Sequence, residues 1–228
     1  MSILVIAEHD NDELKGATLN TITAAKEIGP DIELLVVGFS CDAVVEKACL
    51  IPGISKVLVA DKETYKNFLA ENIGSLVAEI GSDHSHILAS ATSNGKNFMP
   101  RVAALLDVAQ ISEIISVLSE DTFERPIYAG NCIATVKSSD SIKVITVRAT
   151  GFDDCESEGG SAPRENLDLD TNLGISIFVR EFLINLNEDK NLLLNSNLQN
   201  KKVAKYRKYI GAEKISFLKR KIKNKNVR

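Results

Sequence analysis

The sequence predicts an α/β fold, a three-layer domain with a mostly parallel sheet flanked by helices plus an antiparallel β extension. Two observations support this prediction. Over roughly the first 110 residues, short and wholly apolar runs alternate with segments of helical periodicity, as they do in βαβ units. Beyond them, strand-like runs follow one another with only turn signals between them. Since no helix fits between these runs, several must pair antiparallel.

Four strands are predicted in the first part of the chain. Each is apolar at nearly every position, which is typical of strands buried on both faces of a parallel sheet. They cover residues 3–7, 32–39, 56–60 and 87–89. The alternation with helices places them in one sheet.

Helices are predicted between these strands from apolar side chains at helical spacing. The first runs through residues 19–28. The second follows Ser40 or Asp42 as N-cap, and the third covers residues 64–80 with Gly81 as its C′ residue. All three connect consecutive strands.

The stretch 92–107 (TSNGKNFMPRVAALLD) joins the fourth strand to another helix. Proline is tolerated only in the first turn of a helix. The presence of Pro100 therefore predicts a helix beginning near Phe98 or Met99. A strand that feeds a glycine turn and a helix is a frequent place for ligands in open parallel sheets.

This joint does not match a nucleoside triphosphate P-loop. The motif G-x-x-x-x-G-K-[ST] requires glycine at position 90 and Ser or Thr at position 97, where the chain has Ser90 and Asn97. We therefore interpret Gly95 as the residue that permits a tight turn, with Asn94 or Asn97 capping the helix. The alternative is that free N–H groups of the turn contact an anion or a loop of a partner.

The second part of the chain contains four strand-like runs, expected to form a hairpin layer on one edge of the sheet. They cover residues 113–118, 123–128, 132–137 and 143–148. Residues 153–170 are acidic and contain Gly, Ser and Pro, which predicts a loop. Apolar spacing over residues 175–183 predicts one more amphipathic helix.

No catalytic group or metal site is predicted. His84 and His86 have the spacing of two ligands on one strand face, but no third ligand lies near them in sequence. His9 lies in an acidic segment that we expect to be a solvated loop. Residues 158–161 (EGGS) could form an anion nest, but a flexible loop is the favoured interpretation.

Arg125 and Arg148 are charges embedded in predicted strands. They could protect an edge strand from pairing with other chains, or they could dock a partner. Both interpretations stay open.

The four cysteines form no C-x-x-C motif, so we expect all of them to be reduced. They are Cys41, Cys49, Cys132 and Cys155. No apolar run reaches the ~18 residues of a membrane span, and the N-terminus lacks the features of a signal peptide. A soluble protein of a cytosol-like compartment is expected.

Charge is distributed unevenly along the chain. Residues 201–228 hold 12 of the 27 Lys and Arg residues and one of the 31 acidic residues, a formal charge of +11. Residues 1–200 hold 15 basic and 30 acidic residues, a charge of −15. Such a basic tail could contact nucleic acid or an acidic membrane. We favour an unselected extension instead, because its residues are those that AT-rich codons specify.

Residues 1–184 resemble the electron transfer flavoprotein α-subunit family. The segments that carry the resemblance are LVIAEHDN, LNTITAAKEIG, SNGKNFMPRVAALLDVAQISEI, RPIYAGNCIATVKS, KVITVRATGFD and EGGSAP, in that order. The resemblance implies an electron carrier rather than an enzyme with its own substrate. Such a carrier works with a β-subunit and FAD, in fatty acid β-oxidation. It accepts electrons from acyl-CoA and related dehydrogenases and passes them to a membrane quinone reductase.

The resemblance also implies a heterodimer, in the bacterial cytoplasm or the mitochondrial matrix, in which this domain packs against the β-subunit. The residues we consider for partner contact are Gly95, Lys96, Asn97, Arg125 and Tyr128. Contact of the basic tail with nucleic acid or membrane is not favoured.

The family's FAD-binding domain is not recognisable in this chain. Its SGGRG, QTGK and IAxGISGAIQH segments are absent, so no cofactor-binding residue is assigned. We expect residues 1–186 to form the N-terminal domain and 187–228 a divergent tail, and the chain alone not to hold FAD tightly. A frameshift is one hypothesis for the tail, and translation of the other frames downstream of Phe182 tests it. The alternatives are a split or repurposed α-subunit and a stand-alone adenine-nucleotide-binding protein.

Overall fold

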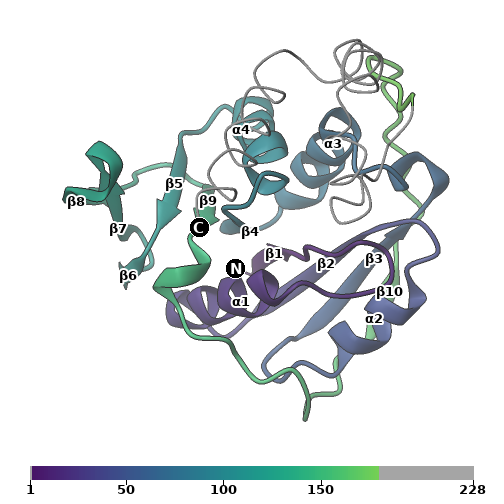
Figure 1. Ribbon diagram of the computed structural model, residues 1–228, viewed down its shortest axis with the longest axis horizontal. Helices are drawn as coiled ribbons and strands as arrows, with labels where there is room; N and C mark the ends of the chain where they lie inside the picture. Colours follow the sequence, from purple (N-terminus) through teal and green to yellow (C-terminus); the bar gives the residue numbers. More distant parts are fainter. Residues whose placement is uncertain (1, 180–228) are drawn as a thin grey trace, which may run out of the picture. The chain divides into compact units, whose positions relative to one another are not determined.

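The computed structural model describes residues 2–179 and contains one seven-stranded sheet in which every pair of neighbours is parallel (Figure 1). The strand order is β10-β3-β2-β1-β4-β9-β5. Its strands are β1 (Ile3–Ile6), β2 (Ile32–Gly38), β3 (Lys56–Asp61), β4 (His86–Ser90), β5 (Gln110–Ile114), β9 (Lys143–Val147) and β10 (Arg164–Asn166). The predicted α/β class and the four N-terminal strands are confirmed.

Four helices cover the two faces of this sheet. They are α1 (Gly16–Ile28), α2 (Asp42–Cys49), α3 (Ala70–Gly81) and α4 (Gly95–Leu105). Helices α1 and α2 lie on one face and α3 and α4 on the other (Figure 1). This arrangement gives the three layers that the sequence predicts.

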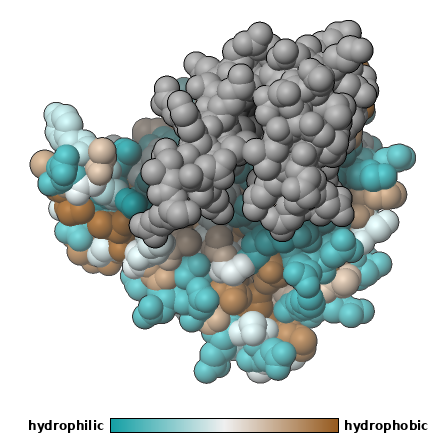
Figure 2. Space-filling model, viewed as in Figure 1, coloured by the Kyte–Doolittle hydropathy of each residue, from teal (hydrophilic) through white to brown (hydrophobic). Residues whose placement is uncertain are grey.

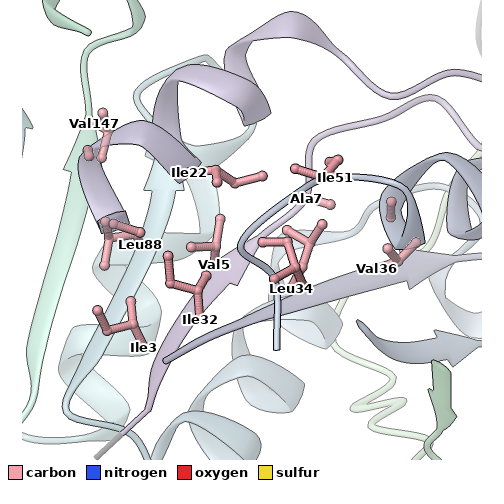
Figure 3. Packing of buried hydrophobic residues seen from close by; sticks show 14 of the residues in the cluster. Ile3, Val5, Ala7, Ile22, Ile32, Leu34, Val36, Ile51, Leu88 and Val147 are labelled. Carbon is pink, nitrogen blue, oxygen red and sulfur yellow. The ribbon is translucent and has the colours of Figure 1, made fainter. Parts of the chain in front are cut away.

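The wholly apolar strands are explained by burial on both faces. Successive side chains of a strand point to opposite sides. In β1, Ile3 and Val5 therefore join the core beneath α1 and α2, while Leu4 and Ile6 join the core beneath α3 and α4. Figure 3 shows the first of these cores, where Ile22 of α1 packs over the side chains of β1 and its neighbours.

A separate three-stranded antiparallel sheet, which we call the β-arm, projects beside β5 (Figure 1). Its strands are β6 (Ser116–Ser119), β7 (Thr122–Ile127) and β8 (Cys132–Lys137). The predicted strand 113–118 divides at Ile115, because the chain leaves β5 there and pairs with β7. Antiparallel pairing is therefore confirmed, but in a second sheet rather than on the edge of the first.

The prediction that residues 143–148 belong to the hairpin layer is wrong. They form β9, which pairs in parallel with β4 and β5 inside the main sheet. Val144 and Ile145 are fully buried on opposite faces. Among the strands of the β-arm only Phe123 is fully buried, so the main sheet buries this apolar segment more completely.

Residues 153–170 are not loop throughout, because they include β10 at the edge beside β3. This strand was missed since its sequence, Arg-Glu-Asn, has no apolar residue and all three side chains are exposed. The prediction of a helix over residues 175–183 is also wrong for the part that the structure describes. Residues 175–179 are not helical, and the remainder lies outside the described residues.

Helix α3 begins at Ala70 rather than Thr64. Residues Glu63–Tyr65 form a separate 3-10 turn, and Phe68 has a φ of 50° that ends any continuous helix. Tyr65 is nevertheless fully buried, although it lies outside the helix. Gly81 is the last residue of the helix rather than its C′ residue.

Two predicted helix starts also need correction. Helix α4 begins at Gly95, which places Pro100 inside the helix. Helix α2 has no side-chain cap from Ser40 or Asp42. The N–H groups of Ser40 and Cys41 donate instead to the carboxylate of Asp61, at 2.8 and 3.1 Å. This acceptor comes from the end of β3, so local sequence could not reveal it.

Candidate functional site

The direction in which the chain adds strands reverses at β1, which lies between β2 and β4. The carboxyl ends of the strands at such a point usually bind ligands in open parallel sheets. Here the hydroxyl of Ser90 donates to the carbonyl of Ala17 at 2.9 Å and lies 3.0 Å from the hydroxyl of Thr21. The N–H of Glu8 donates to Thr18 Oγ1 at 2.9 Å. These bonds hold the first turns of α1 against the ends of β1 and β4.

Gly95 is buried, and this position must be glycine because the start of α4 lies very close to the end of β4. A Cβ atom at this position would lie 2.0 Å from the carbonyl oxygen of Ser90. The N–H groups that follow are also used, because Lys96 donates to the carbonyl of Thr92 at 3.0 Å and Asn97 to that of Asn94 at 2.9 Å. The turn therefore has the structural role favoured by the sequence. The predicted caps are corrected, since Thr92 Oγ1 accepts from the Gly95 N–H at 3.4 Å and neither asparagine side chain caps the helix.

The loop after β1 holds two titratable groups out of solvent. Burial raises the pKa of Glu8, and the Thr92 side chain beside it partly offsets this. Burial lowers the pKa of His9 to about 4. The His9 ring meets Phe68 edge-on, and its Nδ1 accepts the N–H of Asn11 at 3.1 Å. Our prediction of a solvated loop is wrong for His9, which is 6% exposed and neutral at pH 7.

A group of charges gathers where β5, β9 and the β-arm meet. We call it the Glu113 cluster, and it consists of Lys96, Glu113, Arg125 and Arg148. The Lys96 ammonium lies 2.5 Å from Glu113 Oε1. The backbone N–H of Arg148 donates to the backbone carbonyl of Ile114, the residue after Glu113, at 3.0 Å.

Arg125 reaches the Glu113 cluster from the β-arm. Its neighbour Glu124 accepts the N–H of Ile115 at 2.8 Å, which brings β7 close to the end of β5. The hydrogen bond from Lys96 lowers the pKa of Glu113 most, and the charges of Arg148 and Arg125 lower it further. The sequence marked the three cations separately but missed Glu113, because the grouping depends on the sheet order.

The tip of the β7–β8 hairpin presents Tyr128 to solvent. Tyr128 is 78% exposed, and three consecutive residues have positive φ: Tyr128 at 49°, Ala129 at 56° and Gly130 at 91°. Left-handed backbone at residues other than glycine costs about 1 kcal/mol or more each. Leu118 and Ile133 are also exposed on the β-arm. Apolar surface on the β-arm is visible at the left of Figure 2.

The remaining candidate residues have structural partners. His84 contacts the carbonyl of Ile80 and the carboxylate of Glu33, at 3.0 and 3.3 Å. His86 contacts the carbonyl of Glu120 at 2.6 Å, so the two histidines do not converge. Across residues 2–179 there is no group of three side chains suited to hold a metal ion. The four cysteines are free, as expected.

The alternative of an anion nest at residues 158–161 is disfavoured, because the chain itself uses this segment. The N–H of Gly160 donates to the carbonyl of Leu50 at 2.7 Å. A Cβ atom on Gly160 would lie 2.4 Å from the carbonyl oxygen of Ile51. The glycine therefore serves the close packing of this loop on the end of α2.

The family model described as "Electron transfer flavoprotein domain" matches residues 3–172. The chain belongs to the electron transfer flavoprotein family. It is 60% identical over 183 residues to the electron transfer flavoprotein subunit alpha of Pseudomonas aeruginosa, covering 80% of this chain and 59% of that protein. The protein of the same name from Bradyrhizobium diazoefficiens is 51% identical over 181 residues, 79% of this chain and 57% of that one.

A mitochondrial relative from Dictyostelium discoideum, also named electron transfer flavoprotein subunit alpha, is 49% identical over 167 residues. That alignment covers 70% of this chain and 47% of the relative. The chain thus spans between 47% and 59% of the length of these three electron transfer flavoprotein subunits. None of the helices within residues 2–179 is long and apolar enough to cross a membrane.

The family name implies a flavin, but the carboxyl edge of β1 and β4 does not fit a dinucleotide. At the carboxyl edge of β1 and β4, α1 is bonded to both strand ends, and the first N–H groups of α4 are taken by Thr92 and Asn94. The carboxyl of Glu8 lies beside Thr92, where its charge would oppose a pyrophosphate. The same geometry argues against a stand-alone adenine-nucleotide-binding protein.

Proposed function

We propose that this chain acts as the scaffold part of an electron transfer flavoprotein α-subunit. With a β-subunit and FAD, such an electron carrier passes electrons from acyl-CoA and related dehydrogenases to a membrane quinone reductase. The observation that carries the proposal is the 60% identity over 183 residues to an electron transfer flavoprotein subunit alpha. The bacterial cytoplasm or the mitochondrial matrix is the matching compartment.

The chain's own contribution is to hold the β-subunit. The β-arm supports this role, because Leu118, Tyr128 and Ile133 are apolar or aromatic side chains left in solvent. Aromatic and apolar residues of this kind anchor protein interfaces. Lys96 and Asn97 are exposed next to the buried Gly95, so Gly95 serves the contact by positioning its neighbours.

The domain division that we propose is 1–186 for the scaffold and 187–228 for the tail, and its boundary lies outside the described residues. The scaffold offers no fit for FAD at its sheet edge. FAD binding therefore depends on groups beyond residues 2–179, from the β-subunit or from elsewhere.

Co-expression with the β-subunit of the same organism tests this function. The two chains are expected to co-purify, and a flavin spectrum of the complex reports whether FAD is retained. The chain purified alone is expected to lack stoichiometric flavin absorbance. If the β-subunit does not co-purify under any salt condition, the proposed role is wrong.

A pair of variants locates the contact. Tyr128→Ala removes the exposed ring at the β-arm tip and is expected to weaken the complex about tenfold or more, as for an aromatic anchor. Leu50→Ala is the control, because Leu50 is also exposed, at 46%, but lies at the end of α2, which packs on β2 and β3, away from the β5 edge where the β-arm projects. Equal effects of the two changes would exclude the β-arm as the docking surface.

A further inference from the structure

The Glu113 cluster has more positive charge than its own carboxylate can neutralise. Three cations, Lys96, Arg125 and Arg148, surround one anion, so its formal charge is +2. The ion pairs formed between described residues include Lys96 but neither arginine. This local excess contrasts with a charge of −15 over residues 1–200.

Arg125 is the least satisfied of the three cations. It is half-buried, and its Nε atom is inaccessible to solvent with no hydrogen-bond acceptor among the described residues. A buried donor without an acceptor costs about 1–3 kcal/mol, and more when it is charged. Such a group is stabilised when an acceptor arrives from another molecule. Arg148, one residue beyond β9, is exposed, and its charge acts on the same carboxylate of Glu113.

The chemistry of the free donors favours a carboxylate over a phosphate. The N–H groups at the start of α4 are already bonded to Thr92 and Asn94, and the Lys96 ammonium is held by Glu113. What remains is a pair of guanidinium groups, which bind either a carboxylate or a phosphate in a two-point geometry. Because no free N–H groups of α4 are left for a phosphate, the carboxylate is favoured.

The position of the cluster favours a protein as the source of that carboxylate. Arg125 belongs to β7, the strand that ends one residue before the exposed Tyr128. Charged groups beside exposed apolar side chains are the usual makeup of a protein interface.

We infer that Arg125 and Arg148 bind an aspartate or glutamate side chain of the β-subunit, while Glu113 holds Lys96 beside them. This inference rests on the proposed function, because it names the chemistry by which the same β-arm recognises its partner. Glu113 has the second role of reducing repulsion among the cations before the partner binds.

Affinity measurements on the complex test the inference. The full chain is expressed with Arg125→Gln, Arg148→Gln or both, and its dissociation constant for the β-subunit is measured at two salt concentrations. Each change is expected to weaken binding about tenfold or more, because truncating one side of a buried charge pair costs that much. The double variant should also lose most of the salt dependence.

Arg164→Gln is the matched control. It removes the same charge from an exposed arginine on β10, at the opposite edge of the sheet from β5. It is expected to leave the dissociation constant unchanged. Circular dichroism melts of all variants verify that each is folded before binding is measured.

Zero-length cross-linking identifies the partner group directly. Arg148→Lys places a second amine in the cluster, in addition to Lys96, and a carbodiimide should join residue 148 to an acidic residue of the β-subunit, detected by peptide mass spectrometry. The wild-type chain, with arginine at this position, should show no link at residue 148.

The outcomes separate the two proposals. If the wild-type chain does not bind the β-subunit, both the proposed function and this inference are overturned. If the complex forms with the same affinity for the double variant as for wild type, only the inference is overturned. A rise in melting temperature with pyrophosphate that the double variant loses, at unchanged β-subunit affinity, would instead assign a phosphate ligand.

Discussion

Gly95→Ala is the most direct probe of the joint between β4 and α4. The added Cβ would lie 2.0 Å from the carbonyl oxygen of Ser90, whereas ordinary contacts begin near 3.4 Å. The neighbour is backbone rather than a flexible side chain, so either β4 or α4 must shift by more than about 1 Å. Both elements contribute fully buried side chains to the core, including Leu88 and Met99. Overpacking of this kind costs about 1–3 kcal/mol, and we expect the upper end.

Gly16→Ala provides the matched control, because Gly16 is the first residue of α1 as Gly95 is of α4. No atom lies within 4 Å of a Cβ at Gly16, and its backbone is not left-handed. Alanine there should stabilise the protein by about 0.4–1 kcal/mol through the unfolded chain. The two variants should therefore differ by about 3–4 kcal/mol in the free energy of unfolding.

Urea unfolding followed by circular dichroism at 222 nm measures this difference, since the chain has no Trp for fluorescence. With an m value of about 2 kcal/mol/M, the midpoints should differ by about 1.5–2 M. Equal midpoints for the two variants would show that the approach of α4 to Ser90 does not require glycine.

Three further predictions concern groups buried or capped by the fold. The unfolded chain protonates His9 near pH 6.5 and the folded chain near pH 4. The unfolded state therefore binds more protons between these values, and stability falls as the pH drops through this window, by about 3 kcal/mol in all. His9→Gln should flatten that dependence in urea titrations from pH 7 to 4, and an unchanged slope would contradict the assignment. Asp61→Ala should cost about 1–2 kcal/mol, because two N–H groups at the start of α2 lose their acceptor; a loss below 0.3 kcal/mol, roughly the size of a surface effect, would refute the capping role. Burial raises the pKa of Cys41 to about 12 while Cys132 is exposed, so Ellman's reagent should label Cys132 in the native protein and Cys41 only on unfolding; labelling in the reverse order would refute this.

In the β-arm, local sequence predicted the strands correctly but not the sheet to which every strand belongs. Strand-like runs separated only by turn signals predicted antiparallel strands at 123–128 and 132–137, and these pair as β7 and β8. The same kind of pattern at 143–148 led us to assign this strand to the hairpin layer instead of the main sheet. The residues of a strand indicate that it is a strand but not which strands it pairs with. Insertion of β9 between β4 and β5 depends on the burial of Val144 and Ile145 from both sides.

In the candidate site, individual residues could be identified from sequence, but their contacts could not. Arg125 and Arg148 could be marked from sequence as charges embedded in strands, and Gly95 with Lys96 as a turn after a strand. Their meeting with Glu113 could not be predicted, since it follows from the order of β5 and β9 and from the pairing of Ile115 with Glu124.

The sequence by itself determined the α/β class, the positions of the apolar strands and the family. It could do so because burial on both faces leaves wholly apolar runs, and because long contiguous motifs are specific. Only the tertiary structure decided where β9 and β10 pair, that His9 is buried, and that Arg125 and Arg148 share the charge of Glu113. These features arise from contacts between segments far apart in the chain, which leave no trace in local periodicity.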